Sequence, residues 1–449
     1  MTRTSRTRAV ALALLFAATL AAAQDDPDLR PLEPYTAAPL PPPPMAEPAP
    51  SAPTTPTIAP APVAPPATAP APATEATPVP RLRIATFNTS LFDAREGGLI
   101  ARLAGDDANA RRIAAVIQHQ RPDIVLLNEF DFDAWGKAAD AFQRRYLEVG
   151  QHGQAPIAYP HRYFAPVNTG VASGMDLNRD GKVGGSGREH GEDSYGYGEH
   201  PGQYGMLLLS MHPIDTAATR TFQKLPWRAL PGAKSPIDPA TGAAWYPPEI
   251  FARLRLSSKS HWDVAVDTPA GRLHVLAAHP TPPEIDGPEN RNGIRNFDEV
   301  RLWAEYLSPG DKPWLCDDQG RCGGLAAGER FVLLGDHNTD PNDGDALPGA
   351  IAQILEHPRI QSLPAPRSRG GVYSAQAEGG ANLTHKGDPA EDTGSFGPRI
   401  GNLRLDYALP SHGLRVVGSG VFWPVPGETG FEWLDATDHR MVWIDIDAD

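Results

Sequence analysis

From residue 81 onward, apolar residues gather in short blocks whose spacing predicts β-strands. Residues 82–88 (LRIATFN) alternate apolar and polar positions, which is typical of a strand with one buried face. Further apolar blocks predict more strands, at residues 123–131, 206–214, 261–266, 273–280, 331–338, 403–410 and 439–446. Strands therefore dominate this part of the chain.

Two segments instead repeat their apolar residues at helical spacing. Residues 109–120 predict a helix with Asn109 as its N-cap and Pro122 beyond its end. Residues 298–307 predict a second helix between two strands. Because strands and helices alternate without a repeat or an internal linker, residues 81–449 are predicted to form one α/β domain.

The first 80 residues lack these patterns. A basic start, an apolar run at residues 9–20 and Ala21–Ala23 predict a cleavable signal peptide at residues 1–23. A retained anchor is the alternative, but the run is too short to span a bilayer. From residue 31 to 80, 19 of 50 residues are proline, so residues 24–80 are predicted to be a Pro/Ala-rich disordered linker. We therefore expect a secreted or periplasmic protein.

The formal net charge of −14 limits the possible partners. Cleavage after Ala23 would remove three arginines and leave about −17, so non-specific binding to nucleic acid is disfavoured. A nuclease remains possible because a metal ion can supply local positive charge. The sequence has no amphipathic membrane helix, and we expect a monomer without stable membrane insertion.

The two cysteines of the chain, Cys316 and Cys322, lie six residues apart. In an oxidising compartment this spacing favours a disulfide that closes a short loop. Half of a metal site is the alternative.

Polar side chains suited to catalysis stand at the ends of the predicted strands. They are Asn88, Glu129, His279, Asp336, Asn338, Asp406, Asp438 and His439. One polar loop would be ordinary turn chemistry. Six strands that end or begin in this way predict a shared site at one edge of the sheets.

The residue types at these strand ends fit metal-assisted hydrolysis of a phosphate ester. Asn88, Glu129 and Asp438 offer the oxygen ligands that Mg²⁺ or Mn²⁺ prefers. Asp336 can deprotonate an attacking water, and histidines can donate to phosphoryl oxygens. The sequence therefore predicts a metal-dependent phosphoesterase.

Ordered short motifs carry a resemblance to a known superfamily. They are TFN at 86–88, NEFD at 128–131, YGMLLLS at 204–210, GDHN at 335–338, RLDYALPS at 404–411 and TDHR at 437–440. Their order resembles the endonuclease/exonuclease/phosphatase superfamily, which includes deoxyribonuclease I, sphingomyelinases and inositol-polyphosphate 5-phosphatases. The likeness covers residues 81–449 and is closest to a secreted bacterial type. It implies a four-layer α/β sandwich, in which two mixed β-sheets pack face to face with helices outside.

The resemblance also implies a role for each matching residue. Asn88 and Glu129 would lie at the metal, and Asp438 near metal and phosphate. Asp336 would activate water, Asn338 would position the phosphate, and His279 and His439 would stabilise the transition state, with Asp406 orienting His439. The superfamily more often has Gln at position 128 and an aromatic residue at position 337. Tyr204 resembles a tyrosine that approaches the phosphate; a packing role is the alternative.

A separate stretch, MDLNRDGKVGG at residues 175–185, resembles the start of an EF-hand calcium loop. Its oxygen donors would be Asp176, Asn178 and Asp180, with Gly181 at the sixth position. The twelfth position is Gly187, so the usual bidentate carboxylate is absent. Either Ca²⁺ binding or a solvated insertion fits this pattern.

Three further cations are candidates for phosphate binding: Lys259, Arg291 and Arg295. Surface solvation is their alternative role. The substrate could be nucleic acid or a small phosphorylated molecule, so a nuclease and a phosphatase are both expected possibilities. A sphingomyelinase-like hydrolase and a calcium-stabilised binding module without activity are the alternatives.

Overall fold

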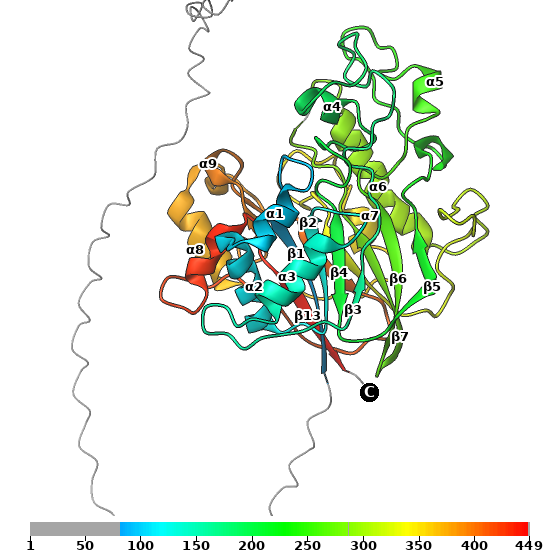
Figure 1. The fold of residues 1–449 in the computed structure, drawn as a ribbon. Helices are drawn as coiled ribbons and strands as arrows, with labels where there is room; N and C mark the ends of the chain where they lie inside the picture. Colours follow the sequence, from blue (N-terminus) through cyan, green and yellow to red (C-terminus); the bar gives the residue numbers. More distant parts are fainter. Residues whose placement is uncertain (1–80, 286, 448–449) are drawn as a thin grey trace, which may run out of the picture. The chain divides into compact units, whose positions relative to one another are not determined.

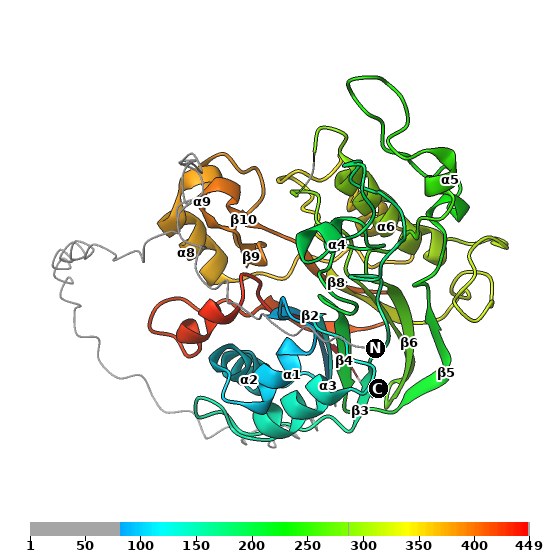
Figure 2. The same cartoon turned by 45° about the horizontal axis from the view of Figure 1, so that its top comes forward.

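The structure is a computed structural model, which describes residues 81–285 and 287–447. The predicted signal peptide and linker lie outside these residues. The described chain forms two β-sheets with helices on their outer faces, as Figures 1 and 2 show from two directions.

The first sheet has six strands in the order β12-β13-β1-β2-β4-β3. Its strands are β1 (Arg81–Leu91), β2 (Ile124–Phe130), β3 (His161–Tyr163), β4 (Met206–Ser210), β12 (Val416–Val421) and β13 (Val442–Asp447). The sheet is mixed, because β1 is parallel to β2 and antiparallel to β13.

The second sheet has five strands in the order β11-β8-β7-β6-β5. They are β5 (Ile214–Thr221), β6 (His261–Thr268), β7 (Gly271–Ala278), β8 (Phe331–Asp336) and β11 (Asp406–Pro410). This sheet is also mixed, with β7 parallel to β8 and the other pairs antiparallel. A two-stranded ribbon joins β9 (Gly394–Ser395) to β10 (Asn402–Leu403).

Nine α-helices connect the described strands. They are α1 (Gly98–Ala104), α2 (Ala108–Gln120), α3 (Lys137–Phe142), α4 (Arg188–Glu192), α5 (Pro248–Phe251), α6 (Arg291–Leu307), α7 (Ala352–Leu355), α8 (Arg369–Glu378) and α9 (Gly397–Ile400). No helix among the described residues is both long and apolar enough to cross a membrane.

Alternation along the strands explains the layers. In β1, Ile84 belongs to the core between the sheets, whereas Phe87 faces the core shared with α1, α2 and α3. In β7, Val275 faces the central core and Leu276 packs toward α6 and α7. Successive strand residues point to opposite faces, so each sheet is buried on both sides. The four-layer sandwich expected from the sequence is confirmed.

Several elements differ from the prediction. Strands β5 and β12 were not expected; both lie at sheet edges, and their partly exposed residues lack a strong apolar pattern. Helix α6 begins at Arg291, seven residues before the predicted start. Asn109 is not the cap of α2, because the Asp107 carboxylate accepts the hydrogen bond from the Ala110 N–H.

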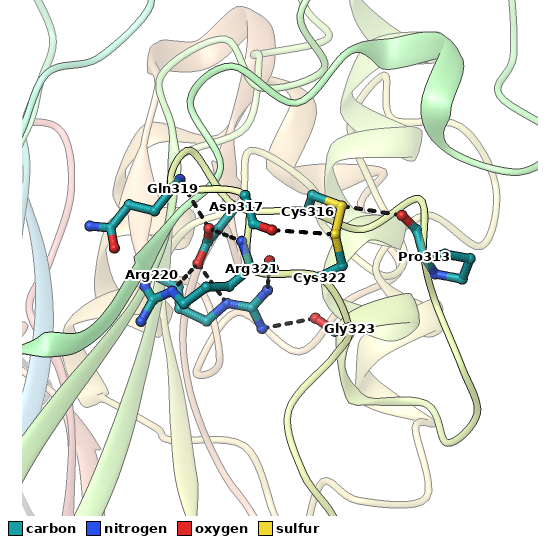
Figure 3. Close-up of a disulfide and its surroundings, with 9 residues drawn as sticks. Arg220, Pro313, Cys316, Asp317, Gln319, Arg321, Cys322 and Gly323 are labelled. Atoms are coloured by element: carbon teal, nitrogen blue, oxygen red, sulfur yellow. Dashed lines mark hydrogen bonds and ion pairs between the residues drawn. A yellow bond between two sulfur atoms is a disulfide. The ribbon is translucent and has the colours of Figure 1, made fainter.

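The structure contains the expected disulfide between Cys316 and Cys322, so these cysteines do not form half of a metal site (Figure 3). The loop it closes presents Asp317, whose carboxylate accepts from Arg220 of β5 at 3.0 Å and from Arg321 at 2.8 Å. The loop therefore holds the edge strand β5 in place.

Candidate active site

The carboxylate of Asp336, at the end of β8, joins the two sheets. Its Oδ2 accepts a hydrogen bond from Asn88 Nδ2 of β1 at 3.0 Å. Its backbone N–H donates to Asn128 Oδ1 of β2 at 3.2 Å. Asp336 is 1% exposed, so these contacts are buried. Residues from three strands thus meet at one buried residue, Asp336.

Two histidines stand on either side of Asp336. His279 follows β7 and His439 precedes β13, and the Nε2 atom of each lies 3.5 Å from Asp336 Oδ2. Asn338 adopts a left-handed backbone (φ 51°), and its N–H donates to Asp336 Oδ1 at 2.9 Å. This turn brings Asn338 back beside the carboxylate that ends the strand.

The two histidines hold different charges. Burial by itself lowers the pKa of His439, but the carboxylates of Asp406 and Asp336 outweigh it and raise that pKa well above its usual value. Burial, with the cations Lys259 and His439 nearby, holds the pKa of His279 well below its usual range. At neutral pH His439 is a cation and His279 is neutral.

Asp406 orients His439. Its Oδ2 accepts from His439 Nδ1 at 2.8 Å and from Thr393 Oγ1 at 2.9 Å. Burial raises the pKa of Asp406 to about 6, so the carboxylate is ionised at pH 7. This pairing fixes the Nδ1 proton and directs Nε2 of the same ring toward Asp336.

Glu129 is the carboxylate of the site that lacks a partner. It ends β2 with a left-handed backbone (φ 55°), and no described residue donates a hydrogen bond to its side chain. Burial raises the pKa of Glu129 to about 7, and the charges of Asp336 and Asp438 act in the same direction. A half-buried acid without a donor fits a site for a divalent cation.

The two other predicted ligands, Asn88 and Asp438, have oxygen atoms with few partners. Asn88 Oδ1 accepts only a long bond from the Ser90 N–H at 3.3 Å, and the side chain of Asp438 is 53% exposed. Asp336, Asp406 and His439 also offer ligand atoms within 4.8 Å of one another. The donor set at this edge could therefore hold a metal ion.

The structure places two of the four candidate phosphate-binding residues beside the site. Tyr204 packs on Phe92 with ring centroids 4.6 Å apart, and burial together with the nearby Glu129 charge raises the pKa of Tyr204. Lys259 is buried, and its pKa is lowered by burial although Glu299, Glu129 and Asp336 oppose that shift. Lys259 thus lies close to the carboxylates of Glu129 and Asp336.

The other two candidates, Arg291 and Arg295, bond to neighbouring loops. Arg295 donates to the carbonyls of Leu256 at 2.9 Å and Tyr195 at 2.6 Å. Arg291 donates to Leu177 O at 3.3 Å and lies 3.4 Å from the carboxylate of Glu289. Both guanidinium groups therefore hold loops together, and phosphate binding by them stays a prediction.

In the predicted calcium loop, side-chain oxygens accept hydrogen bonds from backbone N–H groups of the same loop. Asp176 Oδ2 accepts from Gly181 N at 3.0 Å, and Asn178 Oδ1 accepts from Asp180 N at 3.1 Å. Asn178 Nδ2 donates to Glu192 Oε2 at 2.8 Å. Calcium binding at this loop stays a prediction.

Several residues of the site gave no signal in the sequence. The ring of Phe396 packs edge-on against His439 at 5.2 Å. Burial raises the pKa of Glu284 to about 7, with Asp336 and Asp345 acting in the same direction. Both residues lie in loops, so no strand pattern could have marked them.

Comparisons with known proteins agree with this architecture. A model of the Endonuclease/Exonuclease/phosphatase family matches residues 85–439. A search of curated proteins found no match.

Solved structures with a similar fold include three bacterial proteins. An endonuclease/exonuclease/phosphatase from Beutenbergia cavernae is 18% identical, covering 82% of this chain and 71% of its own, with a TM-score of 0.44. Sphingomyelinase C from Streptomyces griseocarneus is 19% identical, with coverage of 82% and 99% and a TM-score of 0.40. A beta toxin variant from Staphylococcus aureus with bound magnesium ions is 12% identical, with coverage of 81% and 99% and a TM-score of 0.38.

Proposed function

Because the chain belongs to the endonuclease/exonuclease/phosphatase family, we propose that it hydrolyses phosphate esters by attack of a water that Asp336 activates. The observation that carries this proposal is the placement of Asp336 between a cationic and a neutral histidine, each 3.5 Å away. A general base beside one cationic and one neutral hydrogen-bond donor matches the charge changes at phosphorus during hydrolysis.

Each side chain has a task in this scheme. Asp336 accepts the proton of the attacking water. His439, held as a cation by Asp406, donates through Nε2 to a phosphoryl or leaving-group oxygen. His279 stays neutral and offers a hydrogen bond without adding charge. Asn338 orients the phosphate beside the base.

A divalent cation completes the chemistry that these residues supply. Glu129, Asn88 and Asp438 would hold Mg²⁺ or Mn²⁺, which prefer oxygen ligands and keep some of their waters. When bound, the cation neutralises negative charge on the phosphoryl oxygens. Lys259 lies near Glu129 and Asp336, where its ammonium form would add positive charge to the site.

The substrate proposal covers phosphodiesters and phosphomonoesters, so the enzyme acts as a nuclease or as a phosphatase. The net charge of −14 supports a substrate held at the cleft rather than by long-range attraction to a polyanion. The signal peptide predicted at residues 1–23 and the disulfide support the proposal of a secreted or periplasmic setting.

A substrate screen tests the proposal. Purified protein is assayed with Mg²⁺, Mn²⁺ or Ca²⁺ against DNA, RNA, phytate, sphingomyelin and a bis-aryl phosphate. Asp336→Asn keeps the shape of the side chain and removes the base, so turnover should fall roughly 10²–10⁴-fold. Asp298→Asn, a buried carboxylate of α6 bonded to Trp227, serves as the control. Retention of more than half of the activity by Asp336→Asn would overturn the assigned base.

A further inference from the structure

Two buried polar residues of helix α6, Asn296 and Glu299, face the loops that carry the site. Figures 1 and 2 show α6 lying beside the second sheet, and its apolar residues pack against that sheet. Asn296 is 0% exposed and Glu299 is 1% exposed. They stand three positions apart, on the same side of the helix. Burying two polar side chains costs free energy unless they form hydrogen bonds, so their partners indicate what they do.

The carboxylate of Glu299 joins two of the loops. Its Oε1 accepts from the Ser258 N–H at 2.5 Å, and its Oε2 accepts from the Thr281 N–H at 2.7 Å. Ser258 directly precedes Lys259, and Thr281 comes two residues after His279. One carboxylate therefore ties together the backbone segment that carries Lys259 and the segment that carries the neutral His279.

Asn296 adds the third loop. Its Nδ2 donates to Thr281 O at 2.9 Å and to His337 O at 3.0 Å, and its Oδ1 accepts from Thr339 Oγ1 at 2.6 Å. His337 stands between Asp336 and Asn338. The amide thus fixes the loop after β7 against the loop after β8, and with them the spacing between His279 and the catalytic base.

We propose that Asn296 and Glu299 are positioning residues, which set the distances between Lys259, His279 and Asp336 from behind the site. The proposal rests on the phosphoesterase function above. Neither side chain needs to touch substrate. Catalysis by general-base and electrostatic groups requires placement within a fraction of an ångström, and such placement depends on the hydrogen bonds behind those groups.

In the described part of the chain, the predicted metal ligands Asn88 and Glu129 receive no hydrogen bond from Asn296 or Glu299 of α6. Asn88 and Glu129 belong to the first sheet, and the hydrogen bonds of Asn296 and Glu299 reach only loops of the second sheet. Loss of the Glu299 carboxylate should therefore disturb turnover while leaving the affinity for magnesium unchanged. General unfolding would lower both quantities.

The test compares Glu299→Gln and Asn296→Ala with Asp298→Asn. Asp298 is a buried carboxylate of the same helix that accepts from Trp227 Nε1 at 2.8 Å and from Lys234 N at 2.7 Å, away from the site loops. In Glu299→Gln we expect kcat to fall about 10²-fold, because an error of about 1 Å has that effect. Magnesium binding, measured by calorimetry with Mg²⁺ alone, should stay within about twofold of wild type. Asp298→Asn should lower the melting temperature by a similar amount and keep its kcat.

Amide hydrogen exchange tests the hydrogen bonds from the Ser258 and Thr281 N–H groups to Glu299, and it needs no substrate. Glu299→Gln should speed exchange at Ser258 and Thr281, and Asp298→Asn should instead speed it at Lys234. A kcat loss no larger than that of Asp298→Asn overturns the proposal, as does unchanged exchange at Thr281. If wild type hydrolyses no ester in the screen, the proposed function fails, and the exchange at Ser258 and Thr281 alone decides whether these residues hold the loops.

Discussion

The unpartnered carboxylate of Glu129 predicts that a divalent cation must displace a proton to bind. Burial, together with the charges of Asp336 and Asp438, raises the pKa of Glu129 to about 7 against the opposing cations His439 and Lys259. The cation needs the ionised form. Affinity for Mg²⁺ should therefore fall as the pH falls through 7, which is the direction expected for a carboxyl group with a raised pKa.

The magnitude follows from the pKa. With a pKa near 7, about a tenth of Glu129 is ionised at pH 6 and about nine-tenths at pH 8. The apparent association constant for Mg²⁺ should thus rise roughly tenfold between these values, equivalent to about 1.4 kcal/mol. At pH 7, binding should release about half a proton.

Isothermal titration calorimetry in two buffers of different ionisation enthalpy measures both quantities. The apparent enthalpy should differ between the buffers in proportion to the protons released. Glu129→Gln removes the titrating group and a ligand, so it should abolish tight binding. An affinity for Mg²⁺ that stays constant from pH 6 to pH 8, with no dependence on the buffer, would refute the reasoning.

Three other predictions concern separate parts of the molecule. Asp406→Asn removes the charge that raises the pKa of His439, so the alkaline limb of the pH–rate profile should move to lower pH; an unmoved limb would show that His439 is not the essential acid. Replacing Cys316 with Ser opens the disulfide loop and should lower the free energy of unfolding by roughly 2–3 kcal/mol in denaturant titrations. An unchanged midpoint would show that the disulfide does not stabilise the fold. If the loop at 176–181 binds Ca²⁺, Asp176→Ala with Asp180→Ala should remove a Ca²⁺-dependent rise in melting temperature, and the absence of that rise in wild type would mean a polar insertion.

The sequence predicted those parts of the site that stand at the ends of buried strands. Asn88, Glu129 and Asp336 each follow an apolar run, and a sheet delivers such residues to one edge. Residues at loop positions had no such marker, so Phe396 and Glu284 were missed. Edge strands such as β5 were missed because only one of its eight residues is fully buried.

Buried polar residues were the hardest to interpret. Glu299 and Arg295 lie in a helix whose sequence alternates charged and apolar residues, so they were indistinguishable from solvated positions. The structure shows both satisfying backbone groups 18 to 100 residues away in the chain. Partners so distant cannot be paired from one sequence, because no local period connects them.

The arrangement of the site divides its chemistry between the two sheets. Asn88 and Glu129 come from the first sheet, and Asp336 comes from the second, where α6 braces the loop beside it. The hydrogen bond from Asn88 to Asp336 and that from His439 to Asp406 both cross from one half to the other. The site therefore exists only when the central core between the sheets has closed. Asn88 and Glu129 can be changed without touching the loops that α6 holds, and those loops can be changed without touching Asn88 or Glu129. Metal affinity and turnover should therefore respond to different substitutions.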